Sequence, residues 1–429
     1  MTQQRWLRII PVALIMYTIS YVDRTNINLA LEPKISRMMH DLLMDDAMKG
    51  RVAGVLFLGY ALLQIPGGYW ANSWSAKKLI SILLVCWGLC AVGCGLTKTA
   101  GQFGTMRFLL GVSEGGVYPA TLVLLAHWFP RAERARASAY WNLCQPLAVV
   151  ASAPVTGWML GVYGWKTTLI LEGILPFIWL PIWLYFISDH PSEAKWISPE
   201  EREFLETTLR REAEEREPVK AVPLWQSLLC WPVLVMMIIN FFHNAQAYGC
   251  GTFFTASLRE KSFTPLEYGF LLAIPYAVTA VVMVLISRHS DKTHERRGHV
   301  AFIYTVSGIS LVISVLLKQH FWISYALMCL AIPGPFAGLA PFFAIPTETM
   351  PRNVMGPVIG LVNAFGSGVG GFFGPLITGW LKQKYNGITV PFVALGIGML
   401  VGASLCVFLP KSPVRSAALA PAPAGGSAA

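Results

Sequence analysis

Residues 189–226, DHPSEAKWISPEEREFLETTLRREAEEREPVKAVPLWQ, form the longest polar stretch of this 429-residue chain. Six apolar runs precede this stretch and six follow it, and a run of about 20 residues is long enough to cross ~30 Å of hydrocarbon as a helix. The expected helices cover 9–32, 51–73, 79–97, 102–127, 138–160 and 166–187 in the first half, and 228–256, 268–288, 299–317, 322–346, 355–381 and 388–409 in the second. The sequence therefore predicts an all-α polytopic membrane protein with twelve transmembrane helices in two six-helix halves.

The composition agrees with a membrane protein. Apolar residues make up 55% of the chain, charged residues only 13%, and the mean hydropathy is +0.53, whereas soluble domains carry about 25% charged residues. The apolar runs are continuous, which excludes the alternating ten-residue segments of an outer-membrane barrel. The net charge of +10 is interpreted as a signal of membrane orientation rather than of nucleic-acid binding, because basic residues concentrate in cytoplasmic loops.

The polar stretch also divides the chain into domains. We expect an N-terminal six-helix bundle at 1–188, a cytoplasmic linker at 189–226, a C-terminal six-helix bundle at 227–410 and a disordered tail at 411–429, which is rich in Ala, Pro, Gly and Ser. Within the linker, Ser198 followed by Pro199 predicts the start of a surface helix that ends before Pro218. The distribution of Lys and Arg among the loops predicts that both termini and the linker lie in the cytoplasm. We expect the protein to lie in the inner (plasma) membrane.

An internal repeat supports this division. Two loops carry similar residues 219 positions apart, namely Gly68, Asn72, Lys77 and Lys78 in the first and Ser287, Asp291, Arg296 and Arg297 in the second. Parallel repeats of this kind are typical of one transporter architecture.

Both loops resemble the G-x-x-x-D-x-x-G-R-R signature of the major facilitator superfamily, and the first copy departs further because Asn72 stands at the Asp position. Other motifs resemble the anion:cation symporter family within it: YVDRTN at 21–26, GYALLQIPGG at 59–68, RFLLGVSEGGVYPA at 107–120, PTE at 346–348, GLVN at 360–363 and GGFFGP at 370–375. The resemblance covers nearly the whole chain. It implies a transporter of organic anions whose signature loops lock the two halves in the outward-open state.

Four ionisable residues lie deep in apolar runs of the first half: Asp23, Arg24, Arg107 and Glu114. Each would cost at least ~2.5–3.5 kcal/mol in contact with lipid, so all four should face the bundle interior. Arg107 and Glu114 are seven residues apart and share one helix face, whereas the adjacent Asp23 and Arg24 point in different directions. Static ion pairs that only fix helix packing are the alternative interpretation.

The resemblance assigns roles to these four residues. It implies that Asp23 and Glu114 are the proton-coupling sites and that Arg24 binds the carboxylate of the substrate. Arg107 is expected to tune Glu114, with substrate contact as a second role. The physical basis is that low-dielectric surroundings favour a protonated carboxyl, whereas a nearby arginine favours the carboxylate. An anion that occupies the arginine therefore promotes protonation of the acid.

Polar residues elsewhere complete a candidate substrate site. Asn240, His243 and Asn244 form one polar face in the seventh run, and Tyr60, Gln145 and Asn363 match positions that line the cavity in the family. Tyr21, from the first motif, is the remaining candidate. The alternatives are a core tyrosine for Tyr60 and contact between helices for Asn363.

We therefore expect a secondary active transporter that imports a small organic anion, such as a sugar acid or related carboxylate, by proton symport and alternating access. A uniporter or anion exchanger of the same fold and an aromatic-carboxylate permease are the alternatives. The sequence contains no phosphate-binding loop, metal-ligand cluster or nucleophile–base pair, so we expect no enzymatic activity, no cofactor and no metal. The expected partners are the anion, protons and the lipid bilayer, without nucleic acid, and the protein is expected to be a monomer.

Overall fold

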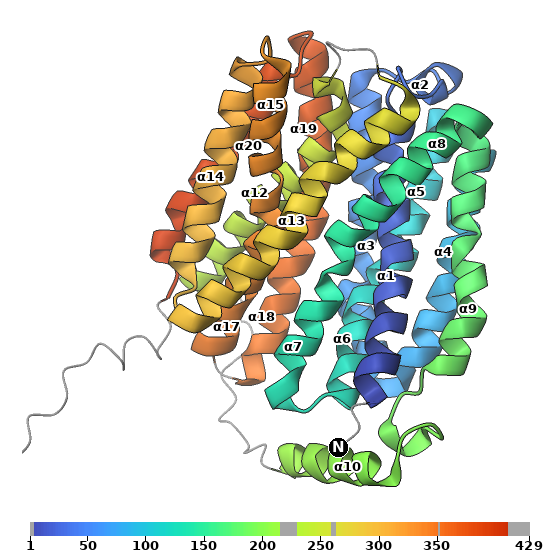
Figure 1. Ribbon diagram of the computed structural model, residues 1–429, viewed down its shortest axis with the longest axis vertical. Coiled ribbons are helices and arrows are strands. Elements are labelled where there is room, and N and C mark those ends of the chain that lie inside the picture. The colour runs from blue at the N-terminus through green and yellow to red at the C-terminus, as the bar shows by residue number, and fades with distance from the viewer. Residues whose placement is uncertain (1–3, 215–229, 259–262, 351, 411–429) are drawn as a thin grey trace, which may run out of the picture.

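The structure is a computed structural model that describes residues 4–214, 230–258, 263–350 and 352–410. Long helices run side by side between the two ends of the molecule (Figure 1). The first half contains α1 (Gln4–Ala30), α2 (Met38–Asp41), α3 (Asp46–Trp70), η1 (Ala71–Ser75), α4 (Ala76–Leu96), α5 (Ala100–Gly115), α6 (Val117–Trp128), α7 (Arg131–Asn142), α8 (Cys144–Gly173) and α9 (Leu175–Phe186). The second half contains α12 (Trp231–Ser257), α13 (Pro265–Thr293), α14 (Arg297–Leu316), α15 (Phe321–Ala331), α16 (Pro333–Ala337), α17 (Leu339–Thr349), α18 (Arg352–Phe365), η3 (Gly366–Gly370), α19 (Gly371–Lys384), α20 (Thr389–Leu405) and η4 (Cys406–Phe408).

The described helices account for twelve crossings of a membrane. Nine helical stretches among the described residues are long and apolar enough to span it, and two of them, Asp46–Leu96 and Arg136–Phe186, have 51 residues each. A straight helix of that length would measure about 77 Å, more than twice the hydrocarbon thickness. Each stretch is interrupted, the first at Ser75, where φ is −171°, and the second at Gly164, where φ is +74° and ψ is 170°. Each therefore provides two crossings, and with α12 the predicted twelve are confirmed.

The linker begins as a structured element on the first half. It contains η2 (Pro191–Glu193) and α10 (Pro199–Glu214). The predicted helix start is confirmed, because α10 begins at Pro199 and the Ser198 hydroxyl accepts a hydrogen bond from the Glu201 amide at 3.3 Å. The buried Arg5 side chain of α1 donates to Glu201 at 2.5 Å and so holds α10 against the first half. The predicted end before Pro218 and the tail at 411–429 lie outside the described residues.

Glycines bring α3 and α5 into close contact, and this contact positions two site residues. A Cβ atom at Gly111 would collide with the carbonyl of Leu56, and one at Gly115 would collide with the carbonyl of Tyr60. Small residues allow helix backbones to approach closely in membrane proteins. The neighbouring Glu114 and Tyr60 are therefore fixed at a tight helix crossing.

The two halves meet closely at the end of the molecule that carries α2. There α3 packs against α19, and α8 packs against α13. A Cβ atom at Gly50 would collide with the carbonyl of Pro375 in the opposite half, and the Lys382 ammonium forms an ion pair with the Asp46 carboxylate. These contacts close the α2 end.

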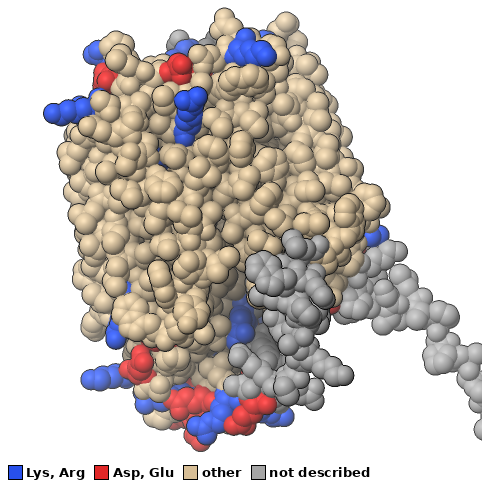
Figure 2. Space-filling view, turned by 180° about the vertical axis from the view of Figure 1, so that it is seen from behind, with Lys and Arg blue, Asp and Glu red and all other residues tan. Residues whose placement is uncertain are grey.

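Charged side chains are concentrated near the two ends on the face shown in Figure 2, and most of the wide band between them is uncharged. Large apolar side chains are exposed along the helices, among them Leu62, Ile82, Leu89, Val281, Leu285 and Phe302, which are 50–62% exposed. An uncharged exterior of this kind is suited to contact with lipid rather than with water. The chain is thus a multi-pass membrane protein.

Candidate functional site

An ion pair between α1 and α5 forms the centre of the candidate site. Arg24 Nε donates to Glu114 Oε2 at 2.5 Å, and the two side chains are only 3% and 0% exposed. The Ser20 hydroxyl donates to the same carboxylate oxygen at 3.1 Å. Ser20 and Arg24 are four residues apart and so reach Glu114 from one face of α1.

Asp23 points away from this pair, as the adjacency of Asp23 and Arg24 predicted. Its carboxylate accepts a hydrogen bond from Trp87 Nε1 of α4 at 2.5 Å. Arg107 lies behind it, and Arg107 Nη1 donates to the Asp23 backbone carbonyl at 2.7 Å. The partner of Glu114 is thus Arg24, and Arg107 contacts α1 near Asp23.

A cavity lies between the halves, and Arg24 is on its wall. Of the predicted substrate-binding residues, six more line it: Tyr60, Gln145, Asn240, His243, Asn244 and Asn363. Asp23, Glu114 and Arg107 do not line it. The cavity therefore combines one arginine with amides and an imidazole, while Glu114 lies directly behind the arginine.

The polar residues of α12 are held in fixed orientations. Asn240 Nδ2 donates to the Val362 carbonyl at 2.8 Å, and Asn244 Nδ2 donates to the Asn240 side-chain oxygen at 3.1 Å. His243 Nδ1 is 2.9 Å from the Tyr304 hydroxyl. This network confirms the polar face predicted for the seventh run.

Asn363 connects the two halves at the cavity. Its Nδ2 atom donates to Gln64 Oε1 of α3 at 3.2 Å. Asn363 thus lines the cavity and also forms a contact between helices.

A second, smaller chamber adjoins the cavity, and Arg24 and Tyr248 line both. Tyr21 lies in this second chamber together with Asn28 and Thr252. Tyr21 therefore does not line the larger cavity, although it is only three positions before Arg24 in the chain. Of the predicted substrate-binding residues, Arg24 alone lines both spaces.

Several aromatic residues of the cavity were not predicted. Tyr17 lines it, seven residues before Arg24 and therefore on the same face of α1, and this spacing is a signal that could have identified it. The Arg24 guanidinium lies 4.3 Å from the centre of the Tyr60 ring and 5.4 Å from that of Tyr17. Tyr118, Tyr248, Phe336 and Phe343 also line the cavity. These rings provide apolar and cation–π surface around a single positive charge.

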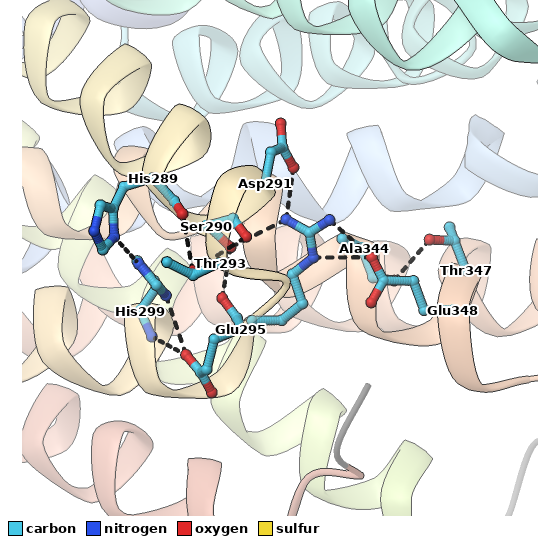
Figure 3. Close-up of polar contacts among 10 residues, drawn as sticks. His289, Ser290, Asp291, Thr293, Glu295, His299, Ala344, Thr347 and Glu348 are labelled. Carbon is cyan, nitrogen blue, oxygen red and sulfur yellow. Dashed lines mark hydrogen bonds and ion pairs between the residues drawn. The ribbon is translucent and has the colours of Figure 1, made fainter. Parts of the chain in front are cut away.

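The repeated loops differ in how they are held together. In the second copy, Arg296 forms ion pairs with Asp291 at 2.6 Å and with Glu348 of α17 at 2.8 Å (Figure 3). In the first copy, where Asn72 replaces the acid, the Asp189 carboxylate accepts hydrogen bonds from the Ser75 hydroxyl at 2.5 Å and the Lys77 amide at 2.9 Å. Asp189, which follows the sixth crossing, thus supplies a carboxylate to the loop in which Asn72 stands at the acidic position.

Glu295 caps the start of α14 beside this second loop. It accepts hydrogen bonds from the backbone amides of Gly298 at 2.8 Å and His299 at 3.1 Å. Partial burial acts to raise the pKa of Glu295, but the bonds from Gly298 and His299 outweigh it and lower the pKa below its ordinary value. The cap therefore holds an ionised carboxylate at the positive end of the helix.

The chemistry of the site is that of binding. Within the described parts of the chain, no three His, Cys, Asp or Glu side chains are grouped in a way that could hold a metal ion. The cavity offers one guanidinium, several amides and aromatic rings, and this combination suits an organic anion.

Comparisons with known proteins agree with the fold. A sequence model described as Major Facilitator Superfamily matches residues 13–375. A putative tartrate transporter of Agrobacterium vitis is 30% identical over 88% of this chain and 87% of its own length, and a quinolone resistance transporter of Acinetobacter baumannii is 27% identical over 93% and 92%. The crystal structure of a bacterial homologue of the human lysosomal transporter Spinster, in an inward-facing and occupied conformation, matches with a TM-score of 0.74 at 16% identity, covering 95% of this chain and 97% of that chain.

Proposed function

The chain belongs to the major facilitator superfamily of membrane transporters, and we propose that it imports a small organic anion together with protons. The observation that carries this proposal is the buried Arg24–Glu114 pair at the cavity wall. A substrate carboxylate that approaches Arg24 competes with Glu114 for the guanidinium. When the substrate takes that place, Glu114 becomes a buried acid without its cation and binds a proton.

Asp23 is the second proton-coupling site in this mechanism. It lies next to Arg24 in the chain but is buried against Trp87 and Arg107. A carboxyl in this position exchanges its proton without touching the substrate. Binding of the anion and protonation together neutralise the cavity, which allows it to close without trapping uncompensated charge.

The substrate class we propose is a sugar acid or a related hydroxy acid. Asn240, Asn244, Gln145 and Asn363 offer donors and acceptors for hydroxyl groups, and tartrate, named for one relative, is a hydroxylated carboxylate. An aromatic carboxylate is the second candidate. It is favoured by the ring-lined wall and by the relative named for quinolones, which are aromatic carboxylic acids.

Transport proceeds by alternating access of the cavity to the two sides of the membrane. The glycine contacts and the Lys382–Asp46 pair close the α2 end, so we assign this conformation to the inward-facing side of the cycle. The protein is a monomer in the inner membrane, with both termini and the α10 linker in the cytoplasm. The distribution of basic residues among the loops supports this orientation.

A thermal-shift screen of purified protein against tartrate, gluconate, galacturonate and hydroxyphenylacetate at two pH values tests the proposal. A ligand that binds only the folded state stabilises it by mass action. We expect one class of acid to stabilise the protein, and more strongly at the lower pH. Stabilisation only by neutral or cationic compounds would contradict the anion assignment.

Proteoliposomes then distinguish symport from the uniporter and exchanger alternatives. We expect a pH gradient, acidic outside, to drive accumulation of the stabilising acid above equilibrium. Uptake that stops at equilibrium whatever the gradient would indicate a uniporter, and uptake that requires an internal anion would indicate an exchanger.

A further inference from the structure

We propose that Glu172 of α8 is a third proton-binding carboxyl of the transport cycle, located between Asp23 and the α2 end. This inference rests on the proposed proton symport and adds a site to it. Glu172 is 5% exposed and lies eight residues, about 12 Å, from the chain reversal at Gly164.

The two oxygens of Glu172 have neutral partners. Asn26 Nδ2 of α1 donates to Oε2 at 2.8 Å, and the Thr156 hydroxyl, on the preceding crossing, contacts Oε1. An amide NH₂ group only donates, whereas a hydroxyl both donates and accepts. A proton on Oε1 therefore keeps both contacts, because it is donated to the Thr156 oxygen. The site thus suits the protonated and the ionised acid alike.

A count of buried charges points to the same residue. Two buried cations of the first half, Arg5 and Lys49, pair with Glu201 and Glu32, acids outside the crossings. The remaining buried charges of these crossings are three carboxyls, Asp23, Glu114 and Glu172, and two guanidiniums, Arg24 and Arg107. A buried charge without a compensating partner is unfavourable, so one acid of the three should carry a proton. Glu114 has Arg24, and Asp23 has Arg107 against its backbone. In the part of the chain that the structure describes, Glu172 has no ion pair.

The position of Glu172 gives this proton a route. Asn26 follows Asp23 by three residues on α1 and therefore lies about 4.5 Å closer to the α2 end along the helix axis. Through its hydrogen bond from Asn26, Glu172 contacts α1 three residues beyond Asp23. Asn26 Oδ1 is buried and has no hydrogen-bond partner among the described residues, so it offers an acceptor to a water that bridges the two carboxyls.

Apart from the residues of α1, the buried titratable groups that the structure describes on the elements packed against α8 are Cys94 of α4 and Tyr268 and Tyr276 of α13. Cys94 of α4 is buried beside Asp23 and Arg107. Glu267 of α13 is exposed and caps its own helix, and Lys166, on the same helix as Glu172, is also exposed. None of these groups supplies a buried cation that would replace the proton.

Infrared difference spectroscopy of the purified protein tests the assignment without any substrate. We expect wild-type protein at neutral pH to show the carbonyl band of a protonated carboxyl, and Glu172→Gln to lose it. Glu201→Gln, which removes a buried acid outside the transport path, should keep the band. If Glu172→Gln does not fold, Thr156→Val serves instead, because loss of the hydroxyl shifts the frequency of the band. A band that neither substitution changes would overturn the proposal.

Proteoliposomes with an internal pH dye and tartrate give the second readout. We expect Glu172→Gln to move one proton fewer per substrate than wild type and to show a shallower pH profile, while tartrate counterflow continues. If wild-type protein moves no protons with any acid, the proposed symport itself is wrong. If wild-type protein is coupled and Glu172→Gln has the same stoichiometry and the same band, only the role of Glu172 is wrong.

Discussion

Replacement of Glu114 by Gln tests how anion binding and protonation are coupled. Gln is neutral, like the protonated acid, and nearly the same size. The variant should therefore leave Arg24 available to the substrate at every pH. In wild type, by contrast, affinity should fall as the pH rises, because the ionised Glu114 occupies Arg24 at 2.5 Å.

The magnitude follows from the burial of the pair. At a charge separation of about 4 Å and an effective dielectric constant of about 20, the attraction is about 4 kcal/mol, or about three powers of ten in affinity. If one proton is bound with each anion, the wild-type Kd should rise by up to about tenfold for each pH unit above the pH at which Glu114 becomes ionised. The Kd of Glu114→Gln should stay flat, and at high pH the variant should bind more tightly than wild type.

Isothermal titration of the stabilising acid at three pH values, one unit apart, measures these slopes. Glu201→Gln is the matched control, because Glu201 also pairs with a buried arginine at 2.5 Å but lies outside the cavity. Glu114→Gln should lose about 3–5 kcal/mol of stability, because it leaves the buried Arg24 without its ion-pair partner. Glu201→Gln should lose less, because Arg5 keeps its ion pair with Glu133 at 2.6 Å. Only Glu114→Gln should lose the pH slope. Folded Glu114→Gln with the wild-type slope, or without binding at any pH, would refute the coupling.

Three further predictions follow from the same structure. Arg24→Gln should abolish the thermal shift produced by the acid at every pH, because it removes the only charge on the cavity wall among the described residues; retained affinity would exclude its role as carboxylate clamp. Asp46→Asn should weaken the ion pair with Lys382 and open the α2 end, so maleimide labelling of Cys250, in a background without other cysteines, should accelerate several-fold; unchanged labelling would contradict a gate there. Glu295→Gln should lower the free energy of unfolding by about 1 kcal/mol near neutral pH. Because the folded-state pKa of Glu295 is lowered, the difference from wild type in thermal unfolding should shrink as the pH falls below about 4. A difference that does not depend on pH would contradict an ionised cap.

The crossings and one side of the cavity were predictable because they depend on local patterns. Apolar runs predicted the membrane helices to within a few residues. The spacing of Asn240, His243 and Asn244 placed them on one face of a helix, and the structure places all three on the cavity wall. Periodicity gives the face of a helix directly.

The partners of the buried charges were not predictable in this way. Arg107 and Glu114 share a helix face, but that spacing does not say which residues they contact. The structure pairs Glu114 with Arg24 and turns Arg107 toward the backbone of Asp23. Nothing in one helix specifies which face of another helix it meets. The close approach of α3 and α5 at Gly111 and similar contacts between other helices determine it.

The amino-acid sequence by itself thus determined that the chain crosses the membrane twelve times, that its longest polar stretch lies at residues 189–226, and that a few charged residues are buried in its first half. These properties follow from the cost of placing polar groups in hydrocarbon, which each segment meets alone. Only the tertiary structure decided that Arg24 lies between Glu114 and the cavity and that Lys382 reaches Asp46 across the two halves. Residues this far apart in the chain come into contact only when the helices pack. Which helices pair depends on all the surfaces that are buried together, so no single segment determines it.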